Sequence, residues 1–195
     1  VRVADVRRQI FYAHTSSEHD EAEKLMSVIQ QKVVSLQEDF ERIYLDVLKA
    51  LGKKNITLID EQQATDQERV WLTQVFHDKI KRYIVPLLIG PNTDFVKAIN
   101  EDATYLCVEV KLGKSVHYAA IEVPTDEISR FLKLPFKSAK RAKRIIMLDN
   151  VIRLCIEELF DGIVPYDALR AFSFKLTRDS EYRLPNDIEQ SVLEQ

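Results

Sequence analysis

One stretch of this sequence limits the choice of folds more than any other: a row of apolar residues at heptad spacing, uninterrupted by glycine or proline. Its members recur at alternating spacings of three and four: Met26, Ile29, Val33, Leu36, Phe40, Ile43, Val47 and Ala50. Such spacing places the side chains along one face of an α-helix, as in coiled coils and helical bundles. We therefore predict one helix from about His19 to Leu51, roughly 45 Å long at about 1.5 Å per residue. Gly52 is predicted to end this helix in the left-handed conformation that glycine adopts most easily.

An apolar row of this length needs other helices to cover it, and the sequence offers one directly before it. Residues 1–14 carry four apolar side chains on one helical face. These are Val3, Val6, Ile10 and Ala13. We expect this segment to pack antiparallel to the long helix, and a further helix upstream of Val1 to complete a spectrin-like helical bundle. Neither this helix nor the one predicted at 187–195 has its outer cap, so we also expect the chain to be a piece of a longer protein.

After Asn55 the apolar period changes, and short strand-like runs alternate with short helical ones. Strands are predicted at 56–59, 84–89, 104–112, 115–123, 145–148 and 168–176. Helices are predicted at 65–83, 93–100, 126–132 and 149–160, with a basic loop over 137–144. The Gly113-Lys114 pair indicates a β-hairpin. The chain is thus expected to be α+β, with long antiparallel helices in residues 1–54 and a mixed α+β domain with a small, mostly antiparallel sheet in 55–195.

The composition excludes several classes of protein. The 195 residues include 28 Lys and Arg against 31 Asp and Glu, a net charge of −3, whereas dedicated nucleic-acid binders are usually basic. No apolar run approaches the roughly 18 residues that a membrane-spanning helix needs. Two cysteines cannot form a disulfide framework, which favours a reducing compartment. We therefore expect a cytoplasmic protein with no nucleic-acid partner and no transmembrane segment.

The residues that usually carry catalysis are scattered along the chain. Four histidines occur without the spacing of a metal site: His14, His19, His77 and His117. Cys107 and Cys155 have no C-x-x-C partner and are predicted to be small buried hydrophobic residues. The chain has only four glycines and no glycine-rich phosphate loop. From these patterns we predict no catalytic residue, no cofactor-binding residue and no metal ligand.

One run of residues is suited to binding an anion. Five cations occur within eight residues, and no acid interrupts them: Lys137, Lys140, Arg141, Lys143 and Arg144. Clustered cations attract polyanions through Coulomb forces and the release of counterions. Since the chain has no glycine loop for phosphate, a phosphate site in it would depend on side chains of this kind. The run is also consistent with a solvated loop before a strand, and the pattern leaves both interpretations open.

Six stretches of the sequence, taken in order, resemble the long, histidine-phosphorylated type of bacterial polyphosphate kinase. They are VRVADVRR at 1–8, IVPLLI at 84–89, TYLCVE at 104–109, MLDN at 147–150, YDAL at 166–169 and TRDSEY at 177–182. Their order and spacing carry the resemblance, which covers essentially the whole chain. It implies that residues 1–54 are the end of a helical N-terminal domain. Residues 55–195 would then be most of the middle, or head, domain, truncated at its C-terminal end.

The resemblance implies a transferase activity for the parent protein. Such a kinase moves the terminal phosphate of ATP to polyphosphate through a phosphohistidine, with magnesium. The family's catalytic histidine lies in C-terminal domains, and no histidine of this chain matches its motif. We therefore expect ATP and magnesium to serve the parent enzyme, no cofactor in this piece, and no activity from this piece alone.

The role that the resemblance leaves for this piece is that of a scaffold. Because the family's head domain serves subunit association, we expect self-association as a homodimer or larger homo-oligomer. The five cations from Lys137 to Arg144 become candidate polyphosphate contacts. The parent is expected in the cytoplasm, with peripheral membrane association left open. An alternative of a different class is a non-catalytic adaptor, with a helical interaction arm and an α+β binding module, and its support is the heptad row alone.

Overall fold

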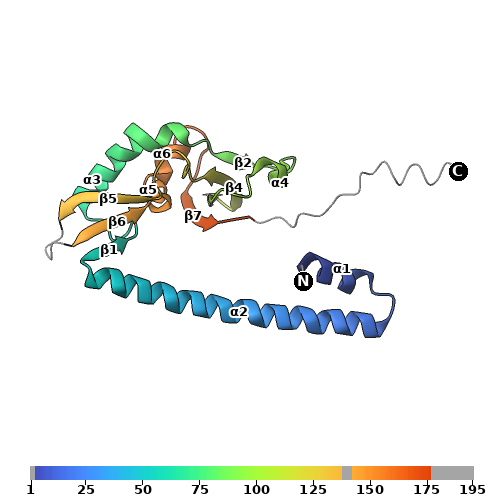
Figure 1. The fold of residues 1–195 in the computed structure, drawn as a ribbon. Coiled ribbons are helices and arrows are strands. Elements are labelled where there is room, and N and C mark those ends of the chain that lie inside the picture. Colours follow the sequence, from blue (N-terminus) through green and yellow to red (C-terminus); the bar gives the residue numbers. More distant parts are fainter. Residues whose placement is uncertain (1–2, 138–141, 177–195) are drawn as a thin grey trace. The chain divides into compact units, whose positions relative to one another are not determined.

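A computed structural model describes residues 3–137 and 142–176 (Figure 1). The described residues separate into two units, one up to Glu41 and one from Arg42 to Leu176. Several sequence predictions lie outside the described residues: those for Lys140 and Arg141, for the TRDSEY stretch and for the helix at 187–195. The domain boundary predicted near residue 54 stays a prediction.

Two helices form the N-terminal part, as the heptad row and the segment before it predict. Helix α1 (Val3–Tyr12) is followed by α2 (Ser16–Lys53), an unbroken helix of 38 residues. A reciprocal cap begins α2: the Glu18 N–H donates to Thr15 Oγ1 (3.2 Å) and the His14 N–H donates to Glu18 Oε2 (3.1 Å). Within this unit Val6 of α1 and Ala22 of α2 are buried. The prediction that α1 is one partner of the long helix is therefore confirmed for the first turns of α2.

The end of α2 differs from the prediction. Gly52 stays helical, and Asn55 is the residue that takes the left-handed conformation, with φ 57°. The N–H of Asn55 donates to the Gly52 carbonyl (3.0 Å), which satisfies one of the last free acceptors of the helix. Asparagine tolerates this region better than most residues because its short polar side chain can hydrogen-bond locally. The helix therefore runs slightly further, and delivers Lys53 and Lys54 to the start of the first strand.

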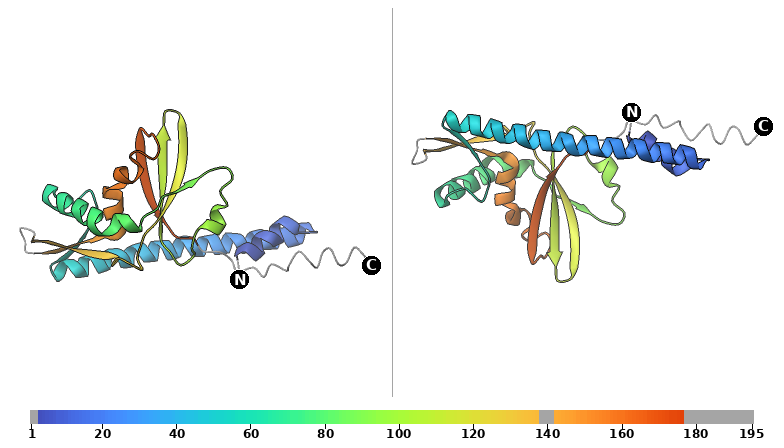
Figure 2. Two further views of the ribbon diagram at one scale, coloured as in Figure 1. Left: turned by 90° about the horizontal axis from the view of Figure 1, so that it is seen from above. Right: turned by 90° about the horizontal axis from the view of Figure 1, so that it is seen from below.

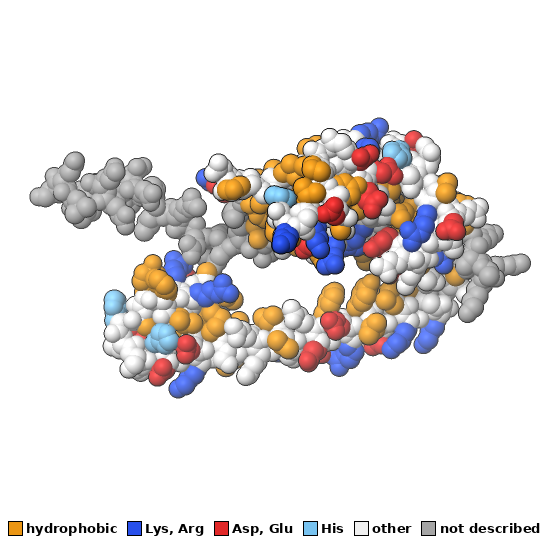
Figure 3. All heavy atoms as spheres, turned by 180° about the vertical axis from the view of Figure 1, so that it is seen from behind, with side chains coloured by type: hydrophobic (Ala, Val, Ile, Leu, Met, Phe, Trp, Pro, Cys, Tyr) orange, Lys and Arg blue, Asp and Glu red, His pale blue; other side chains and the backbone are white. Residues whose placement is uncertain are grey.

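The apolar row of α2 lies largely in solvent beyond the turns that α1 covers. Leu36 is 54% exposed, Phe40 68% and Ile43 58%. In Figure 3, orange apolar side chains recur along this helix. The third helix predicted to lie upstream of Val1 stays a prediction.

The second unit contains two small sheets. Sheet A has the order β1 (Ile56–Ile59), β6 (Lys143–Met147) and β5 (Phe131–Lys137), with β1 parallel and β5 antiparallel to β6. The helix predicted at 126–132 is wrong, because residues from Phe131 onward pair with β6 as an edge strand. Proline is tolerated on such an edge, and Pro135 lies where the register shifts. The basic loop predicted at 137–144 is shorter than expected, since its two ends belong to β5 and β6.

Sheet B is antiparallel and follows the prediction closely. Its order is β2 (Leu87–Ile89), β4 (Ser115–Glu122), β3 (Tyr105–Leu112) and β7 (Ala168–Phe174). Gly113 has φ 58°, the left-handed conformation that joins β3 and β4 as a hairpin. Both views of Figure 2 show the yellow-green hairpin beside the red-orange strand β7. The α+β class with mostly antiparallel pairing is confirmed, with the sheet divided in two.

Short helices connect and cover the sheets. A capping box at Thr65 and Glu68 begins α3 (Asp66–Val75), which continues as the π-helical turn η1 (Phe76–Ile80) and the 3₁₀ turn η2 (Lys81–Tyr83). Helix α4 (Phe95–Ala98) is a single turn. Helix α5 (Leu148–Leu154) starts one residue before the predicted cap, and Cys155 interrupts it before α6 (Ile156–Phe160).

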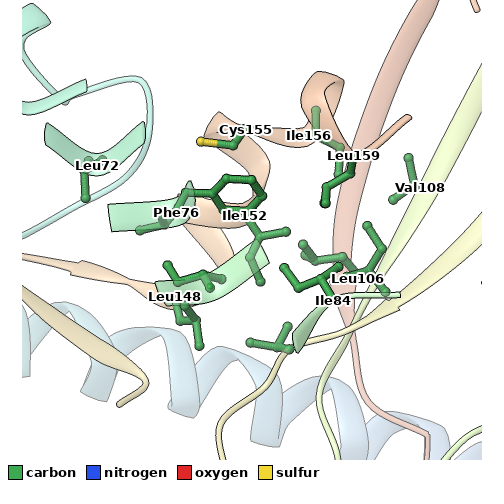
Figure 4. Close-up of a cluster of buried hydrophobic side chains, with 14 of the residues drawn as sticks. Leu72, Phe76, Ile84, Leu106, Val108, Leu148, Ile152, Cys155, Ile156 and Leu159 are labelled. Carbon is green, nitrogen blue, oxygen red and sulfur yellow. The ribbon is translucent and has the colours of Figure 1, made fainter. Parts of the chain in front are cut away.

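The main core lies where α3, η1, α5 and α6 meet the inner face of sheet B. Leu72, Phe76 and Ile80 are fully buried there, and so are Leu106 of β3 and Ile152 of α5. Figure 4 shows the side chains of Phe76, Ile152 and Leu159 converging from three elements. A smaller cluster around Ile99, Tyr105 and Ala120 lies on the other face of sheet B. These contacts join residues far apart in the sequence into one stable unit.

Candidate functional site

Three strand ends meet at one end of sheet A. β1 and β6 both begin there and β5 ends there, because β1 runs parallel and β5 antiparallel to β6. The register pairs Lys143 with Ile56 on one side and with Lys137 on the other. The Lys143 N–H also donates to the Asn55 carbonyl at 2.7 Å. Lys143 is thereby placed beside the end of α2.

This arrangement gathers cations from two separate parts of the sequence. We use the term cationic end for Lys53, Lys54, Lys137 and Lys143. The side chains of Lys53, Lys54 and Lys143 are exposed. In the part of the chain that the structure describes, none of these three forms an ion pair. The backbone register pairs position 137 with position 143, so the sequence has a lysine at both members of this pair.

Sequence reasoning missed Lys53 and Lys54 as part of this surface. In the sequence Lys54 lies 83 positions before Lys137, and Lys53 lies 90 positions before Lys143. Both look like ordinary cations at a helix C-terminus. Only the parallel pairing of β1 with β6 brings the two groups together. Short parallel pairings leave no local signal, because they need a long crossover between the strands.

Arg144 differs from its neighbours, because its guanidinium is engaged within the fold. Its Nε lies 2.8 Å from Glu68 Oε1, and its Nη2 donates to the Gln63 carbonyl at 2.7 Å. The Glu68 side chain is only 3% exposed, and its other oxygen accepts the N–H of Thr65 in the capping box of α3. Arg144 therefore anchors β6 to the start of α3.

A second polar cluster, which we call the Asp149 cluster, joins the two sheets. It consists of Glu61, Arg130, Asp149, Asn150, Arg153 and Ser173. Asp149 at the start of α5 is almost fully buried and accepts a hydrogen bond from Ser173 of β7 at 3.1 Å. Arg153 donates to Ser173, Asn150 and the Ala171 carbonyl. Two arginines lie 3.9 to 4.0 Å from the two acids. Within the described residues Asp149 Oδ1 and Glu61 Oε2 are buried there and accept no hydrogen bond. The cluster therefore joins α5 to β7 and leaves two buried carboxylate oxygens without a hydrogen-bond donor.

Neither cysteine thiol is activated as a nucleophile. Burial raises the pKa of the Cys155 thiol to about 11, and burial and then the charge of Glu109 raise that of Cys107, so both thiols stay protonated at neutral pH. Cys155 is buried as predicted, whereas Cys107 is half-buried because the outer face of β3 is covered only at one end. His77 pairs with Glu158 at 2.6 Å, and His117 lies exposed on β4. Over residues 3–137 and 142–176 no three His, Cys, Asp or Glu side chains gather as metal ligands would.

None of the described helices combines the length and the apolar character that crossing a bilayer requires.

Comparisons with known proteins agree on one family. A family model described as the polyphosphate kinase middle domain matches residues 67–195. Over its full length the chain is 39% identical to a polyphosphate kinase of Yersinia pestis and 36% identical to one of Escherichia coli K12. It spans 28% of the length of each of these curated relatives.

A solved structure supports the fold. The crystal structure of polyphosphate kinase from Porphyromonas gingivalis superimposes with a TM-score of 0.69 over 94% of this chain and 30% of that one. The identity between the two is 23%, so this likeness concerns the arrangement of helices and strands.

Proposed function

The chain belongs to the polyphosphate kinase family, and from this premise we propose that it is a polyphosphate-contacting scaffold of such an enzyme. The single observation that carries the proposal is the cationic end of sheet A. There Lys143 lies in register with Lys137 and beside the residue that follows Lys53 and Lys54. Polyphosphate is a chain of closely spaced negative charges, and a group of cations without acidic partners attracts such a chain.

The reaction that we propose for the parent enzyme is phosphoryl transfer in two steps. In the first, the bond between the terminal phosphorus of ATP and the ADP oxygen breaks as a histidine nitrogen bonds to that phosphorus. In the second, an oxygen at the end of polyphosphate takes the phosphoryl group from the histidine. We place that histidine in the part of the parent that this chain does not span. The four histidines here have no match to the family's catalytic motif, and this piece is expected to be inactive alone.

Two observations guide where we place the nucleotide and the magnesium of the parent enzyme. The sequence has no glycine-rich phosphate loop for a nucleotide. The described carboxylates and histidines do not gather as a magnesium site would. We therefore assign ATP and magnesium to other parts of the parent enzyme, which we propose to be cytoplasmic, with peripheral membrane association left open.

The proposed contacts are Lys137, Lys140, Arg141 and Lys143, joined by Lys53 and Lys54. Arg144 was a sequence candidate for the same role. Its ion pair with Glu68 instead supports a structural role, in which Arg144 holds β6 against the start of α3. We also propose that the head domain self-associates, as the family resemblance implies. The adaptor alternative rested on the heptad row alone, whereas the family match covers residues 67–195.

Binding of end-labelled polyphosphate to the whole chain, followed by fluorescence anisotropy at several salt concentrations, tests the proposal. Replacing Lys140, Arg141 and Lys143 together by Ala should weaken binding at low salt by a factor on the order of ten or more. The salt dependence should fall by about two counterions, because fewer cations release them. The double variant Lys53→Ala/Lys54→Ala should show a smaller change in the same direction.

The matched control removes two exposed lysines elsewhere, in the variant Lys24→Ala/Lys114→Ala. Its overall charge equals that of the Lys53 and Lys54 variant, so only position differs. Equal losses in both double variants would mean that binding follows net charge. An unchanged affinity in the triple variant at low salt would remove the cationic run from the polyphosphate path.

A further inference from the structure

The two faces of sheet B are covered very differently. On the inner face Leu106, Val108 and Ile121 are fully buried in the main core. On the outer face a small cluster around Ile99 and Tyr105 covers one end of the strands. Toward the other end of the outer face, large side chains are exposed.

We call this exposed part the outer patch and define it by seven residues of β3, β4 and β7. They are Cys107, Glu109, Lys111, Val116, Tyr118, Arg170 and Phe172. The register places them on one face, because Cys107 pairs with Phe172, Lys111 with Val116, and Glu109 with both Tyr118 and Arg170. Val116 is 44% exposed, Tyr118 46% and Phe172 58%. Three large apolar side chains exposed together are unusual for a surface that faces only water.

The last described residues already lie on this face. Phe174 and Leu176 pack against the small cluster that covers the other end of the strands. The patch extends from Cys107 to Lys111, about 13 Å along β3 at about 3.3 Å per residue. Residues 177–186 follow Leu176 directly, and such a segment can span up to about 33 Å. The chain after Leu176 is therefore long enough to bring residues 187–195 over the patch.

The sequence of residues 187–195 complements the patch in shape and charge. Ile188 and Val192 are four positions apart, as on one face of a helix. A helix of this length measures about 13 Å, which matches the exposed length of β3. The segment has three acids and no base, namely Asp187, Glu189 and Glu194. The patch has two exposed cations, Lys111 and Arg170, and one acid, Glu109.

We propose that residues 187–195, which lie outside the described residues, pack as a helix on the outer patch. Ile188 and Val192 then contact the aromatic side chains of the patch, and the flanking acids lie near its two cations. The attachment of the segment to β7, its length and its charge all favour this occupant. A second copy of the sheet is a poorer match, because its patch carries the same net positive charge and would repel the first.

Cys107 makes the packing testable in the whole chain. Packed elements lie about 10 Å apart, which a short bis-maleimide reagent can span by adding one thiol at each end. In the variant Val192→Cys we expect a cross-link to Cys107 within one chain, with the mass of one chain plus one reagent. Peptide mapping by mass spectrometry identifies the joined residues. Cys155 is buried and should stay unmodified in the folded chain.

The matched control moves the new thiol to the other side of the predicted helix. Position 190 lies two residues before 192, and two residues turn a helix by about 200°. Gln190→Cys should therefore cross-link to Cys107 with a yield at least about five times lower than Val192→Cys. The variant that combines Val192→Cys with Cys107→Ser should give no cross-link of this mass.

Charge variants separate the contact from effects on folding. In the Val192→Cys chain, Glu189→Lys with Glu194→Lys should lower the yield about tenfold, because lysines then face the cations of the patch. Adding Lys111→Glu with Arg170→Glu should restore the yield, since opposite charges face each other again. A structural defect of the sheet or of the segment would not be repaired by the second pair of changes.

Three results would overturn the proposal. Equal yields from positions 190 and 192 would mean that the segment passes the patch without packing on it. A yield that ignores both pairs of charge variants would exclude the charge contacts. Cross-links with the mass of two chains, rising with protein concentration, would assign the patch to a second copy. Polyphosphate binding is tested separately, by the anisotropy titration.

Discussion

Helix α2 and the α3–η1 segment carry the same kind of apolar row, yet only one of the rows is buried. Leu36, Phe40 and Ile43 of α2 lie exposed, while Leu72, Phe76 and Ile80 have no exposed surface at all. Both rows are spaced for a helix, and at the start of each helix a threonine hydroxyl accepts the N–H of the glutamate three residues later. Local sequence therefore makes two similar helices, and the surroundings make them different.

The difference teaches what an apolar pattern can specify. Spacing determines that a helix forms and which face is apolar. Burial depends on which elements the topology brings to that face. The core cluster that contains Leu72, Phe76 and Ile80 also contains side chains of β3, α5 and α6. For α2 the described residues supply α1 over the first turns only. Burial of apolar surface stabilises a fold by about 25 cal/mol per Å². The row on α3 and η1 contributes this stabilisation, whereas the exposed part of the α2 row contributes little of it.

The sharpest test of the comparison is to delete the same side chain in both rows. Phe76→Ala should lower the free energy of unfolding by about 4 kcal/mol, because it removes a fully buried ring and leaves a cavity. Phe40→Ala should change it by no more than about 0.5 kcal/mol, as expected for an exposed position. Urea unfolding followed by the fluorescence of Trp71, which packs against the main core, measures both. Equal losses would mean that α2 is covered as fully as α3.

A smaller effect is expected from ion pairs in the two regions. Glu68→Ala should cost about 2 kcal/mol, since it leaves the mostly buried Arg144 guanidinium without its carboxylate. On α2 the pair of Lys49 and Asp46 is exposed, so Asp46→Ala should stay within about 0.5 kcal/mol. Removing Arg144 together with Glu68 should cost less than the sum of the two single losses. Additive losses in that double variant would contradict a direct interaction.

The smallest effect concerns the caps. Thr65→Ala should cost about 1 kcal/mol in urea unfolding, because α3 belongs to the cooperative core. Thr15→Ala removes the same kind of cap from α2, and its loss should appear as fraying of the first turns, seen as a small fall in helical circular dichroism. A loss in the Trp71 transition as large for Thr15→Ala as for Thr65→Ala would show that α2 unfolds together with the core.

Much of the fold could be predicted from local pattern. The heptad row predicted α2, and alternation with Gly113 predicted the β3–β4 hairpin. The failures share a cause. The segment 126–132 is predicted to be a helix, whereas its last two residues pair with β6 and begin a strand. Gly52 is predicted to end the long helix, whereas Asn55 takes the left-handed conformation at the turn into β1.

The candidate site could be predicted only in part. The charge run itself is visible in the sequence, but two of its features depend on distant partners. The ion pair of Arg144 with Glu68 and the approach of Lys53 and Lys54 both follow from the position of β6 between β1 and β5.

Hydrogen exchange of the whole chain, read segment by segment by mass spectrometry, tests the central contrast most directly. The amides of β3 and α5 should exchange only through global unfolding, and those of α2 from residue 33 to 47 should exchange at least about 100-fold faster through local opening. Equal protection in α2 and β3 would contradict the account, because it would mean that the exposed apolar row is held by contacts as stable as the core.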